Sequence, residues 1–166
     1  MARTDANPKR RWYRAATALL ICHIPGILGG LFTAPAIRSL WYQNLQKPSF
    51  QPPAVWFAPV WLLLYTLMGI SLFLAWPRSE NPASRTTARW FAVQFLLNTL
   101  WSPVFFYLQY PLAALLVLLL LLLSAGRWVF LLYRSRAHTA AILQIPYLLW
   151  LCFATLLNGA IVSLNP

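Results

Sequence analysis

Long apolar runs alternate with short polar or proline-containing segments along the chain. Five runs suffice to cross a membrane, near residues 15–35, 54–76, 88–109, 112–134 and 139–163. A helix of about 20 apolar residues spans a hydrocarbon core of about 30 Å. Inside that core each backbone polar group needs a partner within its own segment, so the runs are predicted to be helices. The pattern therefore predicts an all-α fold, an integral membrane bundle of five transmembrane helices.

The segments outside these runs divide the chain into a short arm and one membrane domain. Residues 1–14 form a basic N-terminal arm, and residues 15–166 hold the helices and a structured, proline-containing first loop at residues 36–53. The Ala-Pro-Ala sequence at residues 34–36 imitates a signal cleavage site, but we favour a retained helix because of the motif that follows it. Only residues 109–111 join the third and fourth runs, so we expect a tight antiparallel hairpin there.

Composition supports the membrane interpretation. Hydrophobic residues make up 60% of the chain and charged residues only 9%, whereas soluble domains carry about 25% charged residues. The net charge of +11 raises the possibility of nucleic-acid binding. The basic residues stand in short clusters between apolar runs and not on one soluble face, so we expect no nucleic-acid partner.

The distribution of Lys and Arg predicts an orientation. Eleven of them fall on one side of the predicted bundle: Arg3, Lys9, Arg10, Arg11, Arg14, Arg78, Arg85, Arg89, Arg127, Arg134 and Arg136. Only Arg38 and Lys47 fall on the other side. In an inner membrane the positive-inside rule then places the N-terminus in the cytoplasm. An outer membrane, where that rule does not apply, remains an alternative.

The apolar runs contain little acid–base or metal-binding chemistry. None holds an Asp or Glu, which weakens an ion-coupled transporter and excludes a pair of catalytic carboxylates in the spans. Cys22 and Cys152 form no CxxC pair, so we interpret both as small buried hydrophobes and expect no metal site. His23 is either a haem ligand or a hydrogen-bonding partner of a neighbouring helix.

Aromatic residues are abundant, with nine Trp, seven Tyr and ten Phe. Six of them fit interfacial belts: Trp12, Tyr13, Trp76, Trp90, Trp128 and Tyr133. Trp61, Trp101 and Trp150 lie deeper in their runs, each in the half nearer the first loop. Asn98 adds a polar amide, and the spacing of Trp150, Ala154, Leu157 and Asn158 places these four on one helix face. This set predicts either an aromatic-packed core or an apolar ligand cavity.

Four motifs resemble those of one known family. Residues 41–53 read WYQNLQKPSFQPP, similar to the WYxxLxKPxxxPP signature of the TspO family of tryptophan-rich sensory and translocator proteins, also called peripheral-type benzodiazepine receptors. Residues 57–69 resemble its second helix, and residues 98–106 resemble its LNxxWxPxFF pattern. Residues 145–158 resemble its PYxxWxxFAxxLN pattern.

The resemblance implies a five-helix bundle, often dimeric, with a pocket capped by the first loop. It implies binding of protoporphyrin IX or haem as ligand, with no obligatory cofactor. The ligand-binding residues expected from it and from the spacing are Trp61, Tyr65, Asn98, Trp101, Ser102, Trp150, Ala154, Leu157 and Asn158. The lid residues are Trp41, Tyr42, Lys47, Pro48, Pro52 and Pro53. If the family's reported light-dependent porphyrin breakdown occurs here, Trp61 and Trp150 are the expected reactive residues.

The chain departs from the family pattern at two places. The cholesterol-recognition segment of eukaryotic members needs a Tyr and a following basic residue, but residues 159–163 read GAIVS, so we expect at most weak cholesterol binding. Ser102 stands where some members place an Asn in the pocket. The favoured function is porphyrin sensing, transport or light-dependent degradation by a membrane protein in contact with lipid, which we expect to form a homodimer. A transporter or channel for another small hydrophobic ligand is the alternative.

Overall fold

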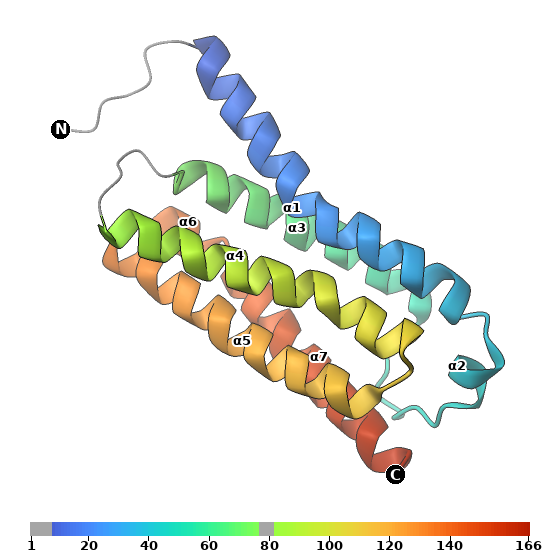
Figure 1. Cartoon of the computed structure of the whole chain (residues 1–166). Coiled ribbons are helices and arrows are strands. Elements are labelled where there is room, and N and C mark those ends of the chain that lie inside the picture. The colour runs from blue at the N-terminus through green and yellow to red at the C-terminus, as the bar shows by residue number, and fades with distance from the viewer. Residues whose placement is uncertain (1–7, 77–81) are drawn as a thin grey trace.

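The computed structural model of the chain describes residues 8–76 and 82–166 (Figure 1). Within these residues the chain is helical and contains no strand. The five long helices are α1 (Pro8–Ala36), α3 (Phe57–Leu74), α4 (Pro82–Ser102), α5 (Pro111–Arg134) and α7 (Ile145–Leu164). The short elements are α2 (Leu40–Asn44), the 3-10 helix η1 (Ala54–Trp56), the π-helix η2 (Pro103–Tyr107) and α6 (His138–Ile142). The predicted all-helical bundle is confirmed.

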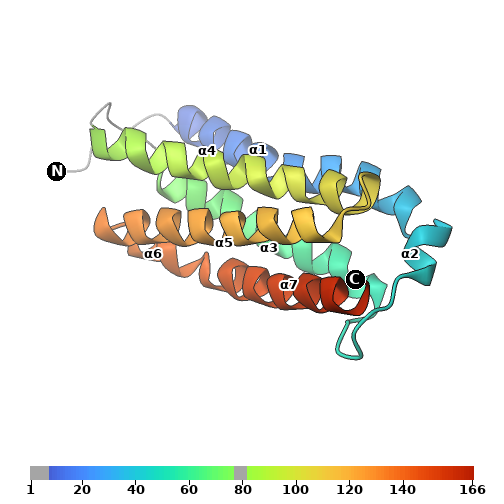
Figure 2. The same ribbon diagram turned by 60° about the horizontal axis from the view of Figure 1, so that its bottom comes forward.

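The long helices pack side by side with α4 and α5 antiparallel, as Figures 1 and 2 show. Helix α1 lies against α3 and α4, and α7 lies against α5. The α4–α5 turn contains Gln109 in the left-handed region, with a φ of 54°, and forms the tight hairpin that the sequence predicts. We call the end with α2 and the first loop the lid end. The opposite end, where α1, α4 and α6 begin, is the basic end.

Four of the helical segments are long and apolar enough to cross a membrane: Pro8–Ala36, Ala54–Leu74, Pro111–Arg134 and His138–Leu164. Large apolar side chains such as Leu20, Leu63 and Leu123 are exposed on the outside of the bundle, as expected for a surface that contacts lipid. Helix α4 does not meet the same criterion by itself. It carries Arg85 and Arg89 near its start, and its apolar sequence continues into the π-helix.

Helix boundaries differ from the expected ones where prolines and capping intervene. Helix α1 begins at Pro8, so part of the arm predicted at residues 1–14 is helical, while residues 1–7 lie outside the described residues. The last run divides into α6 and α7. Pro146 stands in the first turn of α7, where a residue without an N–H is tolerated, whereas inside a continuous helix it would break a hydrogen bond.

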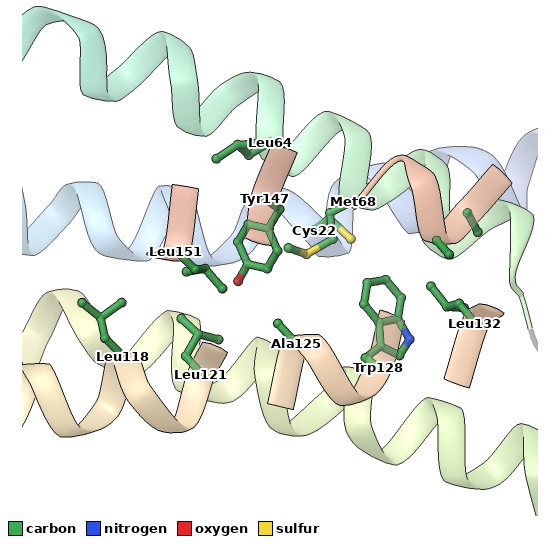
Figure 3. Close-up of a cluster of buried hydrophobic side chains, with 12 residues drawn as sticks. Cys22, Leu64, Met68, Leu118, Leu121, Ala125, Trp128, Leu132, Tyr147 and Leu151 are labelled. Carbon is green, nitrogen blue, oxygen red and sulfur yellow. The ribbon is translucent and has the colours of Figure 1, made fainter. Parts of the chain in front are cut away.

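The core contains one buried tryptophan that the sequence assigns to an interfacial belt. Trp128 is only 1% exposed and its ring centroid lies 5.1 Å from that of Phe91. Figure 3 shows it among Leu132, Met68 and Cys22. The belt assignment of Trp128 is therefore wrong, because α4 and α3 cover this face of α5. The assignment of Cys152 as buried is also wrong, since it is exposed on α7, while Cys22 is buried as predicted.

Close helix approach depends on glycine at two positions of the α1–α3 interface. A Cβ at Gly69 would lie 2.9 Å from the Cα of Leu19, and one at Gly26 would lie 2.6 Å from the Tyr65 ring. A side chain larger than hydrogen therefore cannot fit at Gly69 without separating the helices. Gly26 and Gly30 have a GxxxG spacing in α1, but a Cβ at Gly30 would meet nothing within 4 Å, so of these two only Gly26 serves packing inside the bundle.

Candidate ligand-binding site

Two tryptophan rings from different helices meet in the lid half of the bundle. Trp61 of α3 and Trp150 of α7 lie edge to face, with centroids 6.3 Å apart and an interplanar angle of 84°. Trp61 also stacks on Tyr65, with centroids 5.2 Å apart at 25°. The Trp61 and Trp150 side chains are each half-buried. Both geometries are favourable for aromatic quadrupoles, so the rings hold each other in fixed orientations.

A cavity of about 70 Å³ lies beside these rings. Seven of the residues predicted to bind ligand line it: Trp61, Asn98, Trp101, Trp150, Ala154, Leu157 and Asn158. They come from α3, α4 and α7, so the depth comparison made from the sequence correctly brought three helices to one place. The lining is mainly apolar with a few polar groups, as is usual for sites that take hydrophobic small molecules.

Two predicted ligand-binding residues do not line the cavity. Tyr65 is 5% exposed and its hydroxyl donates to Asn98 Oδ1 at 3.0 Å, so it lies behind the Trp61 ring as support. Ser102 faces α1, where a Cβ at Gly29 would lie 2.8 Å from its Oγ. Its hydroxyl lies at the α1–α4 interface and not in the cavity. Ser102 directly follows Trp101 in the sequence. Side chains of consecutive residues in a helix point about 100° apart around the helix axis, so Ser102 does not share the direction of Trp101.

A chain of hydrogen bonds fixes the deep wall of the cavity. Asn98 Nδ2 donates to the Tyr147 hydroxyl at 2.6 Å, and that hydroxyl donates to Gln94 Oε1 at 3.2 Å. Gln94 Nε2 lies 3.6 Å from the Met68 sulfur. Buried polar groups that satisfy one another in this way give a rigid, uniquely ordered core. Asn98 therefore presents its amide to the cavity from a fixed position.

A second amide closes the cavity nearer the lid. Trp101 Nε1 donates to Asn158 Oδ1 at 3.3 Å, and Asn158 Nδ2 donates to the Pro111 carbonyl at 2.9 Å. Asn158 thus links α4, α7 and the start of α5. Both amides at the cavity are neutral, and no charged side chain is among its described lining residues. The site therefore suits an uncharged, largely apolar group.

The first loop covers the cavity. We call residues 41–53 the lid. Tyr42 and Gln51 line the cavity directly. The other predicted lid residues are not among its lining residues: Trp41, Lys47, Pro48, Pro52 and Pro53. Burial raises the pKa of Tyr42, and a hydrogen bond with Gln51 partly opposes that shift. The phenol therefore stays neutral at physiological pH.

Edge-on aromatic contacts attach the lid to the bundle, and Lys47 orders it internally. Trp41 packs edge-on to Phe105, with centroids 5.8 Å apart, and Phe50 packs similarly on Phe153 at 6.4 Å. Lys47 Nζ donates to the Tyr42 carbonyl at 2.6 Å and lies 4.4 Å from the centre of the same residue's ring. The lid is thus ordered internally as well as attached to the bundle.

Comparison with known proteins shows the family of the chain. The model of the TspO/MBR family matches residues 18–164. The chain belongs to the TspO/MBR family. It is 41% identical to the tryptophan-rich protein TspO of Archaeoglobus fulgidus over 84% of this chain and 89% of that protein. It is 35% identical to protein CrtK of Rhodobacter capsulatus over 91% and 92% of the two chains. It is also 37% identical to the human translocator protein, over 71% and 70%.

Several cavity residues of this TspO/MBR protein escaped the sequence-based prediction. They are Gln51, Phe57, Phe105, Phe106, Leu118, Leu121 and Ile161. Leu118 and Leu121 belong to the leucine-rich run of α5, whose uniform composition gives no sign of which face looks inward. Phe105 and Phe106 are turned inward by the π-helix, in which the Leu108 N–H donates to the Pro103 carbonyl at 2.9 Å. Such π-turns occur frequently at functional sites. Pro103 is the sequence feature from which this π-helix could have been predicted.

His23 does not reach the cavity of this TspO/MBR protein. Its Nδ1 lies 2.8 Å from the Leu19 carbonyl, and its Nε2 lies 3.4 Å from Thr66 Oγ1 of α3. This geometry matches the interpretation of His23 as a hydrogen-bonding residue between helices. Among residues 8–76 and 82–166, no group of three His, Cys, Asp or Glu side chains is placed to hold a metal ion.

Proposed function

We propose that this TspO/MBR membrane protein binds a flat hydrophobic tetrapyrrole, protoporphyrin IX or haem, at the lid end of the bundle. The crossed rings of Trp61 and Trp150 beside a neutral, lid-covered cavity carry the proposal. Indole faces and edges bind a flat aromatic ligand by dispersion and quadrupole contacts. The two neutral amides, Asn98 and Asn158, provide polar contacts for the pyrrole nitrogens.

Binding of a tetrapyrrole requires the cavity to expand. Its volume of about 70 Å³ is well below the roughly 300–1,000 Å³ of pockets that enclose drug-sized ligands. The proposal therefore includes outward movement of the lid, which covers the cavity with Tyr42 and Gln51. The protein as described corresponds to a closed state.

The biological role proposed for this binding is porphyrin sensing or transport. Relatives named tryptophan-rich sensory protein, from Cereibacter sphaeroides, and translocator protein, from Bos taurus, are 33% identical to this chain. A homodimer in an inner membrane, with the N-terminus in the cytoplasm, is part of the proposal. Cholesterol is proposed to bind weakly, and no nucleic-acid partner is proposed.

Titration of the purified protein with protoporphyrin IX in the dark tests the proposal. We expect saturable binding, with quenching of tryptophan emission and a shifted porphyrin absorption band. Competition by haem and no competition by an aliphatic alcohol of similar hydrophobicity would show selection for a flat ring. Partition that never saturates, and that equals partition into empty detergent micelles, would refute the proposal.

Light-dependent porphyrin degradation is a second candidate activity. The observation that favours it is the contact of the Trp61 ring with both Trp150 and Tyr65, since all three side chains are oxidisable. Illumination of the complex distinguishes the candidates. Loss of the porphyrin band that is faster than for free porphyrin, and slower in Trp61→Phe, favours degradation. A stable band favours sensing or transport alone.

A further inference from the structure

A second cavity lies at the basic end of the bundle, remote from the lid. Its volume is about 290 Å³, several times that of the cavity beside Trp61. It opens between the C-terminal end of α3, the N-terminal end of α4 and the C-terminal end of α5, which lie together at one end of the bundle in Figures 1 and 2. None of its lining residues belongs to the candidate tetrapyrrole site.

The lining of this cavity is mainly apolar and includes three hydroxyl residues, of which Thr87 and Ser135 donate to the Ala83 and Leu132 carbonyls. Phe91 and the buried face of Trp128 line the interior, and the side chain of Leu132 beside them is visible in Figure 3. Ser84, Thr87 and Ser135 are the hydroxyl residues in the lining. The space holds about ten groups of the size of a water molecule. A hydrocarbon chain is chemically suited to such a mainly apolar lining.

The end of the bundle at which this cavity lies carries positive charge among its described residues. The chain's two acidic residues fall outside the described residues, and the described charged side chains at this end are all basic: Lys9, Arg10, Arg11, Arg14, Arg85, Arg89, Arg127, Arg134 and Arg136. Arg136 stands between Ser135 and Ala137, both of which line the cavity, in a left-handed conformation with a φ of 61°. An apolar cavity with a basic margin at a membrane surface matches a lipid with an anionic headgroup.

We propose that this cavity binds one acyl chain of an anionic phospholipid, with the phosphate at the basic margin beside Arg136. The hydrocarbon chain replaces empty space against Phe91 and Trp128, and the headgroup remains at the membrane–water interface. A zwitterionic lipid offers the same chain but no net charge to the basic margin. The site is independent of the tetrapyrrole proposal, because it uses the other end of the bundle.

Native mass spectrometry of the full chain, released from micelles doped with phosphatidylglycerol or phosphatidylcholine, tests the proposal. We expect phosphatidylglycerol to be retained at least fivefold more than phosphatidylcholine. Ala88→Trp places a ring in the cavity and should reduce retention about tenfold. Ala92→Trp, the same change one turn along α4 and outside the cavity lining, should leave retention unchanged. Arg136→Gln should lower it severalfold and Arg10→Gln should not.

A second blocking variant keeps the test valid if Ala88→Trp does not fold. Ala83→Trp fills the same cavity from the first turn of α4, and the thermal midpoint of each variant shows whether it remains folded. Loss of retention in a folded blocking variant, with Ala92→Trp unaffected, supports the site. Equal retention by the parent and a folded blocking variant would overturn it, as would equal retention of the two lipids by the parent.

Discussion

At the scale of single residues, Trp61 and Trp150 have a double role. Each ring contacts the cavity and also supports the other ring, at 6.3 Å. A substitution therefore removes ligand contact area and loosens the partner ring at the same time. Stability must be measured beside affinity for this reason, and a matched tryptophan away from the site is needed. Trp12 is suitable, because it is 77% exposed at the basic end.

Trp61→Ala or Trp150→Ala should weaken protoporphyrin IX binding by roughly 30-fold or more. A stacked ring contributes about 0.5–1.5 kcal/mol beyond area burial, and loss of the indole's buried area raises the total to about 2–4 kcal/mol. Each 1.4 kcal/mol is about tenfold in affinity. Fluorescence titration measures the change, and Trp12→Ala should bind like the parent. If both cavity variants are folded and also bind like the parent, the ligand lies elsewhere.

Asn98 offers a stability test of the buried hydrogen-bond chain. Asn98→Leu leaves the Tyr65 hydroxyl without its acceptor and the Tyr147 hydroxyl without its donor. We expect a loss of about 1–3 kcal/mol, since buried unsatisfied groups are costly but polar contacts inside membrane bundles average less. Thr99→Ala is the control, because that hydroxyl only donates to Phe95 of its own helix. Similar thermal midpoints for the two variants would argue against a stabilising network.

At the scale of elements, the sequence predicts the helices well and the irregular segments poorly. Apolar length alone locates α3 and α5 closely, because the bilayer fixes how long a span must be. The π-helix at Pro103 and the division between α6 and α7 depend on local proline geometry. The π-helix turns Phe105 and Phe106 toward the cavity, and the division between α6 and α7 brings Tyr147 within reach of Asn98. Periodicity could not reveal these details, nor which leucines of α5 turn inward.

The lid is fastened to the last helix by a reciprocal amide pair, and Asn165→Ala should release it. The Gln46 N–H donates to Asn165 Oδ1 at 2.9 Å, and Asn165 Nδ2 donates to the Gln46 carbonyl at 2.9 Å. Without these two bonds, each worth about 0.5–1.5 kcal/mol, the Gln46 amide should exchange with deuterium roughly tenfold faster. Hydrogen exchange with peptide-level mass spectrometry measures this. Asn44→Ala, in an exposed part of the lid, should leave the exchange unchanged. Equal exchange in all three proteins would contradict the role of the Gln46–Asn165 pair in holding the lid.

The C-terminal part of α7 allows a test of sterol affinity. The Tyr and the basic residue of the cholesterol-recognition pattern are missing between Gly159 and Ser163, so the parent should bind cholesterol only weakly. A Cβ at Gly159 would meet nothing within 4 Å, so Gly159→Tyr fits without strain. Combined with Ser163→Arg it should raise affinity severalfold, although such motifs are weak determinants. Photo-crosslinking with a cholesterol analogue measures both. Submicromolar binding by the parent would refute the inference.

At the scale of the whole molecule, charge is divided between the two ends of the bundle. Only Arg38 and Lys47 are basic at the lid end, and the latter donates to lid carbonyls. The remaining described basic residues gather at the opposite end, as their positions along the sequence predict. Two of the eleven counted there, Arg3 and Arg78, lie outside the described residues. The antiparallel arrangement of successive long helices therefore turns a pattern along the chain into a polarity of the molecule.

This polarity predicts that the N-terminus lies in the cytoplasm and Pro166 on the other side of an inner membrane. Retention of Lys and Arg on the cytoplasmic side orients helices during insertion, and eleven against two is a strong bias. Reporter fusions active only in the periplasm should work at the C-terminus and fail at the N-terminus. Reducing the bias provides the control: replacing Arg85, Arg89 and Arg136 with Gln should leave the orientation unchanged, because the basic cluster in the first turns of α1 remains. A C-terminal fusion that is active only in the cytoplasm would contradict the predicted orientation.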